Sequence, residues 1–159
     1  MTTKNSDLVA NFEASPQVFN NAALLGGELR VAQGTIELAA GDSTDNDIVM
    51  FAPIPSHATI TQLFVASDAL GGSCTFNVGL YLPDGTVKDE DVFATSVADG
   101  AAMADVRFEA ADINTAGQRA FELAGDSTDP GDYYYVAATF NATGGTAGTM
   151  SFLIHYVVN

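Results

Sequence analysis

The chain has 159 residues, a length typical of one domain, and its 47% hydrophobic content is enough to bury a core. Twenty acidic residues against five basic ones give a formal net charge of −15. This charge argues against nucleic acid and anionic membranes as partners, because both are bound through lysine and arginine. Fifteen glycines, no tryptophan and only 16% charged residues are typical of an all-β protein.

Residues 1–27 differ from the rest of the chain and predict an N-terminal arm. They carry scattered apolar side chains without a sustained period of 2 or 3.6, too few for a core of their own. We expect the arm to become ordered against a partner through Leu8, Phe12, Val18 and Phe19. An arm packed on its own domain is an equally weighted alternative. A Gly-Gly pair at residues 26–27 marks the boundary, and residues 28–159 are predicted to form the domain.

The N-terminal segment also bears on localisation. It lacks a basic stretch followed by an apolar run, so we expect no secretory signal, and we expect synthesis and folding in the cytoplasm. No stretch approaches the roughly 18 apolar residues of a membrane span. The lone Cys74 cannot form an intrachain disulfide, so the fold does not depend on an oxidising compartment.

The first strand expected in the domain changes its apolar face partway along. Leu29 and Val31 share one parity, whereas Ile36 and Leu38 share the other. A bulge or break near residues 33–34 would return the apolar side chains to the core, so we predict one there. A similar change of parity near Gln62 predicts a second irregularity in the strand over residues 57–67.

Alternation and turn signals predict most of the remaining elements. Residues 74–82 alternate cleanly, and the Pro-Asp-Gly-Thr run at 83–86 predicts a tight turn in which glycine accepts a positive φ. Further strands are expected over residues 48–52, near 92, and over 120–124, 133–140 and 149–158, with a helical turn around 101–105. About eight strands with short loops and no long amphipathic helix predict an antiparallel β-sandwich of jelly-roll type.

The segment GDSTD occurs twice, each time behind Glu-Leu-Ala, at residues 37–47 and 122–132. The carboxylates Asp42 and Asp45 in the first loop, and Asp126 and Asp129 in the second, are hard oxygen ligands of the kind calcium prefers. Neither loop has the full spacing of a calcium loop, so we favour a strand-ending turn, in which Asp and Ser side chains bind freed backbone N–H groups. We therefore predict no metal and consider these loops as interface rims.

No catalytic constellation is visible, and we expect neither an enzyme nor a cofactor. His57 and His155 lie in no nucleophile, zinc or thiol-protease context, and Cys74 opens a strand on its apolar face. The run Tyr133, Tyr134 and Tyr135 cannot face one core, because neighbours on a strand point in opposite directions. At least one ring is expected at the surface or at an edge, where it would be a contact feature.

Several strings, taken in order, carry a resemblance: TTKNSDLVANFEASP, RVAQGTIELAAGDSTDNDIVMFAPIPSHATI, NVGLYLPDGTVKDEDVFATSV and AFELAGDSTDPGDYYYVAATF. From about Arg30 to the C-terminus, their order resembles small head proteins of tailed bacteriophages that decorate or cement the capsid. The resemblance implies a jelly-roll-like sandwich that trimerises on the outside of the head and clamps neighbouring subunits of the major capsid protein. A lectin-like or fibre-head module that binds host glycans, with or without calcium, is the alternative hypothesis.

Overall fold

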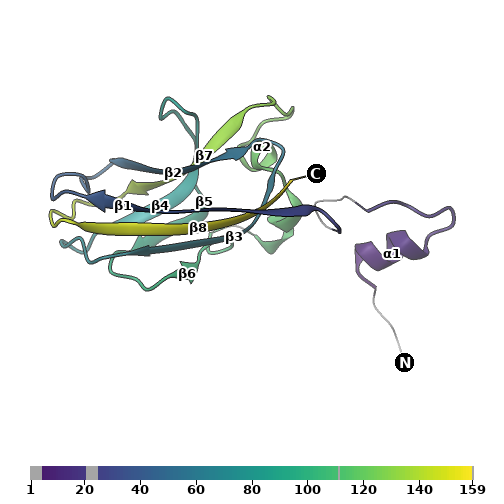
Figure 1. Cartoon of the computed structure of the whole chain (residues 1–159), viewed down its shortest axis with the longest axis horizontal. Coiled ribbons are helices and arrows are strands. Elements are labelled where there is room, and N and C mark those ends of the chain that lie inside the picture. The colour runs from purple at the N-terminus through teal and green to yellow at the C-terminus, as the bar shows by residue number, and fades with distance from the viewer. Residues whose placement is uncertain (1–4, 21–24, 111, 159) are drawn as a thin grey trace.

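The computed structural model describes residues 5–20, 25–110 and 112–158, and within them it contains two antiparallel four-stranded sheets. One sheet has the strand order β1-β8-β3-β6 and the other β2-β7-β4-β5 (Figure 1). The strands are β1 (Glu28–Leu38), β2 (Ile48–Pro55), β3 (Thr59–Ser67), β4 (Thr75–Tyr81), β5 (Val87–Ala98), β6 (Ala104–Asp105), β7 (Tyr133–Phe140) and β8 (Gly148–Val158). The helices are α1 (Asp7–Glu13), the 3₁₀ helix η1 (Ile113–Gly117) and α2 (Ala120–Leu123).

The core lies between the two sheets and is built from alternate residues of their strands. Because successive side chains on a strand point to opposite faces, each strand contributes every second residue to this layer. The buried set includes Ile54, Leu63, Phe76, Val78, Leu80, Phe93, Val136, Phe140, Met150 and Ile154. The predicted all-β antiparallel sandwich is confirmed, and so is the turn at residues 83–86, where Gly85 has a φ of 86°.

The bulge predicted in the first strand is wrong, whereas the one predicted near Gln62 is confirmed. β1 pairs with β8 in unbroken register from Glu28 opposite Val158 to Leu38 opposite Gly148. Leu29 and Val31 therefore stay on the outer face of the sheet, where they are 58% and 52% exposed. In β3, by contrast, the register with β8 shifts between Ile60 and Gln62. A change of apolar parity thus marks either a bulge or apolar side chains on both faces.

The segment AFELA, predicted as a strand, instead begins with the short helix α2. The backbone N–H groups of Ala120 and Phe121 donate to the carbonyl oxygens of Ala58 and Ser56, and the amide of Arg119 donates to Oε2 of Glu122 over 2.7 Å. Ala120, Phe121 and Leu123 are all buried, which a single helical turn against the sandwich end achieves and an alternating strand would not.

The strand predicted near residue 92 is confirmed as part of β5, whereas the helical turn predicted around residues 101–105 is wrong. β5 continues to Ala98 because it pairs with β4 along its length, and Ala104–Asp105 is not a helical turn but the short strand β6, paired with β3. Gly100, with a φ of 69°, reverses the chain between them. Pairing partners distant in sequence decided these elements, and local composition did not reveal them.

Candidate functional site

The described part of the arm forms a small unit of its own beyond one end of the sandwich (Figure 1). The Asn11 side chain donates to Oδ1 of Asn20 over 2.9 Å, and the Asn20 amide donates to the carbonyl oxygen of Leu8 over 3.0 Å. Phe12 and Phe19 are 67% and 91% exposed, and Val18 is exposed as well. Residues 1–4 and 21–24 of the predicted arm lie outside the described residues. Its role in binding a partner stays a prediction.

The first GDSTD loop joins β1 to β2 and is closed by its own carboxylates. Asp42 accepts the backbone N–H of Ala39, and Asp47 accepts that of Thr44, both over 2.8 Å. Ser43 is fully buried, and its carbonyl oxygen accepts the N–H of Gly144 over 2.8 Å in the loop between β7 and β8. The predicted polar turn is present here, while Asp45 stays at the exposed surface.

The second GDSTD loop has the same residues, but its aspartates accept hydrogen bonds from different partners. Asp126 accepts hydrogen bonds from Nζ of Lys88 over 2.7 Å and from the Tyr134 hydroxyl. The bond from Lys88, followed by that from Tyr134, lowers the pKa of the Asp126 carboxyl below its ordinary value. Asp129 accepts bonds from the Ser56 hydroxyl and from a backbone N–H, and the Ser56 bond is the main cause of its lowered pKa.

The two loops lie at opposite ends of the sandwich, one after β1 and one after α2 (Figure 1). The interpretation that both follow a strand end is therefore wrong for the second copy. Among the described residues, no group of three or more His, Cys, Asp or Glu side chains is arranged to hold a metal ion. The structure does not bring the carboxylates of the two loops together, because the sandwich separates them.

The side chains of the three consecutive tyrosines point alternately to the two faces of the sheet, as their position at the start of β7 requires. Tyr133 is 52% exposed, Tyr134 is 1% exposed and bonded to Asp126, and Tyr135 is half-buried. Only the Tyr133 ring is therefore broadly presented to a partner among these three. The expectation of one surface ring is confirmed, and its part in an interface stays a prediction.

The residues considered for catalysis have ordinary structural surroundings. The thiol of Cys74 is buried, donates to the carbonyl oxygen of Ala142 over 3.0 Å, and has its pKa raised by that burial. His155 is in hydrogen-bond contact with Oε1 of Gln62 over 2.7 Å on the outer side of its sheet. His57 and His155 stand on different elements, and the structure assembles no triad around either of them within the residues it describes.

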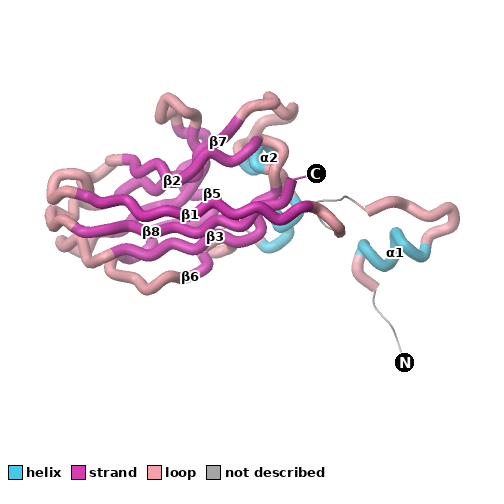
Figure 2. Tube along the Cα trace, viewed as in Figure 1, coloured by secondary structure: helices cyan, strands magenta, loops and turns pink. Residues whose placement is uncertain are grey.

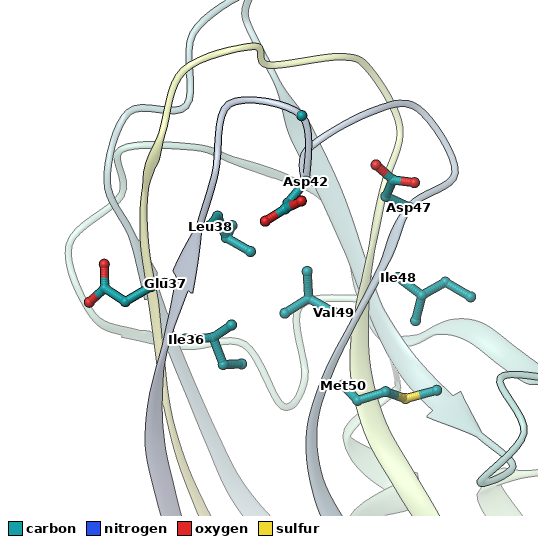
Figure 3. A pocket seen from close by; sticks show the side chains of 9 residues that line it. Ile36, Glu37, Leu38, Asp42, Asp47, Ile48, Val49 and Met50 are labelled. Carbon is teal, nitrogen blue, oxygen red and sulfur yellow. The ribbon is translucent and has the colours of Figure 1, made fainter.

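An open groove of about 570 Å³ runs between the edges of the two sheets, beside the first GDSTD loop (Figure 3). Its sides are β1 and β2, each of which pairs with a single neighbour within the described residues. Ile36, Leu38 and Val49 project into the space between the strands. Glu37, Asp42 and Asp47 also line it, although the Glu37 carboxylate points to the other side of β1 (Figure 3).

The groove combines an apolar floor with an acidic rim. Such a surface suits an apolar side chain flanked by basic groups, because the floor removes apolar area from water while the rim attracts positive charge. Asp42 and Asp47 each also accept a backbone hydrogen bond through Oδ2, which holds both carboxylates in place at the rim. Sequence reasoning identified Asp42 but assigned Ile36 and Leu38 to the core only. The feature that marks Ile36 and Leu38 as groove residues is their position at the end of an edge strand.

None of the helices in the described part of the chain has the length and apolar character needed to cross a membrane. Comparison with known proteins adds evidence on the fold alone. No protein-family model matches the chain, and no curated protein matches it. A chain of the acid-stable capsid structure of Helicobacter pylori bacteriophage KHP30 is 14% identical, with a TM-score of 0.41 and coverage of 83% of this chain and 90% of that one.

A second solved structure gives a stronger match. A chain of the cyanophage Pam1 capsid asymmetric unit is 18% identical, with a TM-score of 0.60, and the alignment covers 100% of both chains. The expected resemblance to phage capsid-associated proteins is confirmed at the level of the fold. This chain is similar in fold, from end to end, to a chain of a phage capsid.

Proposed function

We propose that this protein is a non-enzymatic structural component of a phage virion, which binds the outside of the head as a trimer and cements neighbouring capsid subunits. The observation that carries the proposal is the full-length likeness to a chain of a phage capsid unit, which extends over both chains completely. The major capsid protein is the partner that this role requires.

The strand order supports a jelly-roll assignment of the sandwich. Eight strands are divided into β1-β8-β3-β6 and β2-β7-β4-β5, so the chain crosses repeatedly between the sheets and the last strand lies beside the first. Two interleaved antiparallel sheets of four strands are the arrangement of a jelly roll, a fold used for viral capsid domains. The fold admits other functions, so the argument for this function also needs surfaces suited to a partner.

Two such surfaces are available for the capsid. The arm presents Phe12 and Phe19 almost without cover, together with Val18 and the half-buried Leu8, and exposed apolar side chains of this kind gain free energy when a partner covers them. The groove between β1 and β2 offers an apolar floor with a carboxylate rim for a basic, apolar segment of a capsid subunit. Asp45, at the exposed tip of the same loop, extends that rim.

The test is co-sedimentation of the purified full chain with phage heads that lack it. We expect saturable binding at regular sites, and heads that melt at a higher temperature when decorated. A full chain that neither binds heads nor raises their melting temperature would overturn the proposal.

The arm is tested separately with the double variant Phe12→Ser, Phe19→Ser. Its control is Ile113→Ser, which removes an apolar side chain that is 72% exposed on the domain itself. We expect the arm variant to bind heads at least tenfold more weakly and the control to bind like the unmodified chain. Equal binding by both variants would remove the arm from the capsid contact.

A further inference from the structure

The outer face of the β1-β8-β3 sheet carries no Asp, Glu, Lys or Arg side chain along its middle, and His155 is the one titratable group among its residues named below. Inward residues such as Met150, Ile154, Leu63 and Val65 are buried, so the alternate positions of the same strands point away from the core. We call these outward residues the neutral face. They are Leu29, Val31, Gln33 and Thr35 on β1, Ser151, Leu153, His155 and Val157 on β8, and Gln62, Phe64 and Ala66 on β3.

Six of the eleven residues of the neutral face are apolar, and the other five are polar. Its three strands lie side by side across the front of the sandwich in Figure 2. Leu29 and Val31 are 58% and 52% exposed, and farther along the face Leu153 and its partner Phe64 on β3 are half-buried. The exposed side chain of Met103 borders a shallow hollow of about 370 Å³ on the same side. Contiguous exposed apolar surface of this kind marks an interaction site.

The absence of charge is notable because the rest of the chain is strongly acidic. The sequence has 20 acidic residues and 5 basic ones. Three of the described basic side chains, on Arg30, Lys88 and Arg119, already pair with carboxylates of the same chain, and Arg107 is fully buried. A basic partner is therefore drawn to other surfaces of this molecule, whereas the neutral face offers it no carboxylate.

The same charge distribution favours a second copy of this chain as the occupant. Two molecules of charge −15 repel each other through most orientations, since like charges brought together across an interface cost several kcal/mol. The carboxylates nearest the neutral face, those of Glu37, Asp68 and Asp105, lie at its borders. Contact through the middle of this face buries apolar area without burying a carboxylate.

We propose that the neutral face is the surface through which copies of this chain associate. The inference rests on the proposed function in so far as the copies that associate are those of the proposed virion component. Leu29 and Val31 supply the apolar anchors, because they are the most exposed apolar residues of the face. Around them, the side chains of Gln33 and Gln62 are exposed and carry the donors and acceptors for hydrogen bonds to a neighbour.

The experiment compares two valine variants of the full chain. Val31→Glu adds one carboxylate to the neutral face, and Val87→Glu adds one to β5 in the other sheet. The two valines are matched, with 52% and 47% exposure on strands. Sedimentation equilibrium of each purified protein measures the association constant, and circular dichroism checks the fold. Leu29→Asp serves as a second variant of the face should Val31→Glu fail to fold.

We expect the unmodified chain and Val87→Glu to form the same oligomer, and Val31→Glu to associate at least about 100-fold more weakly, because each contact would bring carboxylates together in an apolar interface. An unmodified chain that stays monomeric, or a Val31→Glu oligomer as stable as the unmodified one, would overturn the proposal. The proposal would also be overturned if deletion of residues 1–27 abolished the oligomer while Val31→Glu associated like the unmodified chain.

These outcomes are separate from the test of the proposed function. Head binding is measured on heads, and association is measured on the free protein in solution. An oligomer that depends on Val31 but does not bind heads refutes the capsid role and leaves the neutral face as the association surface. A monomer that binds heads at saturable sites supports the capsid role and refutes the neutral face as the association surface.

Discussion

Nε of Arg107 donates a hydrogen bond to the carbonyl oxygen of Ile60 over 2.9 Å, in the interior of the sandwich. A second guanidinium nitrogen donates to the carbonyl oxygen of Thr115 over 3.1 Å. The guanidinium carbon lies 5.1 Å from the ring centroid of Phe93 and 4.5 Å from that of Phe108. Arg107 is fully buried, and this burial lowers its pKa to about 10. The side chain thus ties the segment after β6 to β3.

Truncation of this side chain is expected to be costly. Arg107→Ala removes the guanidinium hydrogen bonds to the carbonyl oxygens of Ile60 and Thr115 and opens a cavity, so we expect the free energy of unfolding to fall by about 3 kcal/mol. Arg30→Ala is the control, because that side chain is half exposed and pairs only with a nearby exposed carboxylate. Urea unfolding measures both. A loss below about 1 kcal/mol for Arg107→Ala would contradict the structural role assigned to it.

Gly79 on β4 lies directly under the backbone of β5. The register of these strands jumps from Val78 opposite Ala94 to Leu80 opposite Asp89, so β5 carries extra residues across the glycine. A Cβ at position 79 would overlap the carbonyl groups of Asp89 and Glu90. The requirement for glycine here is therefore one of space, and not of a positive φ.

Gly79→Ala should lower the free energy of unfolding by at least about 2 kcal/mol, because β5 must move off β4 to admit the methyl group. Gly41→Ala is the matched control, since a Cβ at that position meets no atom within 4 Å. Thermal and urea unfolding of both variants measure the difference. Equal stability of the two variants would show that β5 does not cross β4 as described.

The contact of Asp126 with Lys88 and Tyr134 predicts a dependence on pH. Because the carboxyl pKa is lowered in the folded protein, first by Lys88 and then by Tyr134, its stabilisation is complete above the ordinary carboxyl pKa. It is lost as the pH falls through the lowered, folded-state pKa. We expect Asp126→Asn to be less stable at pH 7 by about 1 kcal/mol, and the gap to close on acidification below about pH 4.

The measurement is the urea midpoint of both proteins from pH 7 down to pH 2.5. Asp45→Asn, in the other GDSTD loop at the position equivalent to Asp129, is the control. Its carboxylate accepts a bond only from the neighbouring Asn46 side chain among the described residues. We expect that control to match the unmodified chain within about 0.5 kcal/mol at pH 7. A gap for Asp126→Asn that does not change with pH would contradict this account.

Two buried threonines should respond oppositely to the same substitution. Oγ1 of Thr59 has no hydrogen-bond partner among the described residues, whereas the Thr139 hydroxyl bonds to the Tyr81 hydroxyl. Thr59→Val exchanges a buried unpaired hydroxyl for a methyl group, so we expect unchanged or higher stability, by up to about 1 kcal/mol. Thr139→Val should lower stability by about 1–3 kcal/mol, since it leaves the buried Tyr81 hydroxyl alone. The reverse order of melting temperatures would contradict both assignments.

Local sequence signals were sufficient to predict a strand or turn where the physical cause of that element is itself local. The alternation of residues 74–82 reflects the period of a strand, and the turn at 83–86 depends on a positive φ at Gly85, so both were predicted from the sequence. The change of parity near Gln62 marked a true bulge. The same signal near Gly34 did not, because β1 keeps one register with β8 while apolar residues occupy both of its faces.

The candidate sites were predicted less completely than the fold. The aspartates of the GDSTD loops were found from their spacing, but Asp42 joins an apolar groove and Asp126 joins Lys88, 38 residues away. Neither association has a sequence pattern, because the partners come from other strands. Arg107 was missed for the same reason: an arginine in a loop-like stretch is predicted to be exposed, and only the packing of Phe93 and Phe108 makes it a buried residue.

The sequence by itself determined that this is an acidic all-β chain, since net charge, strand alternation and turn residues are properties of composition and of short segments. Only the tertiary structure decided which apolar residues form the core and which form surfaces. Val31 and Val65 are equally apolar, yet one is 52% exposed and the other 2%. Their difference comes from the pairing of β1, β8 and β3 and from the second sheet covering one face only, and those contacts join residues more than 80 positions apart.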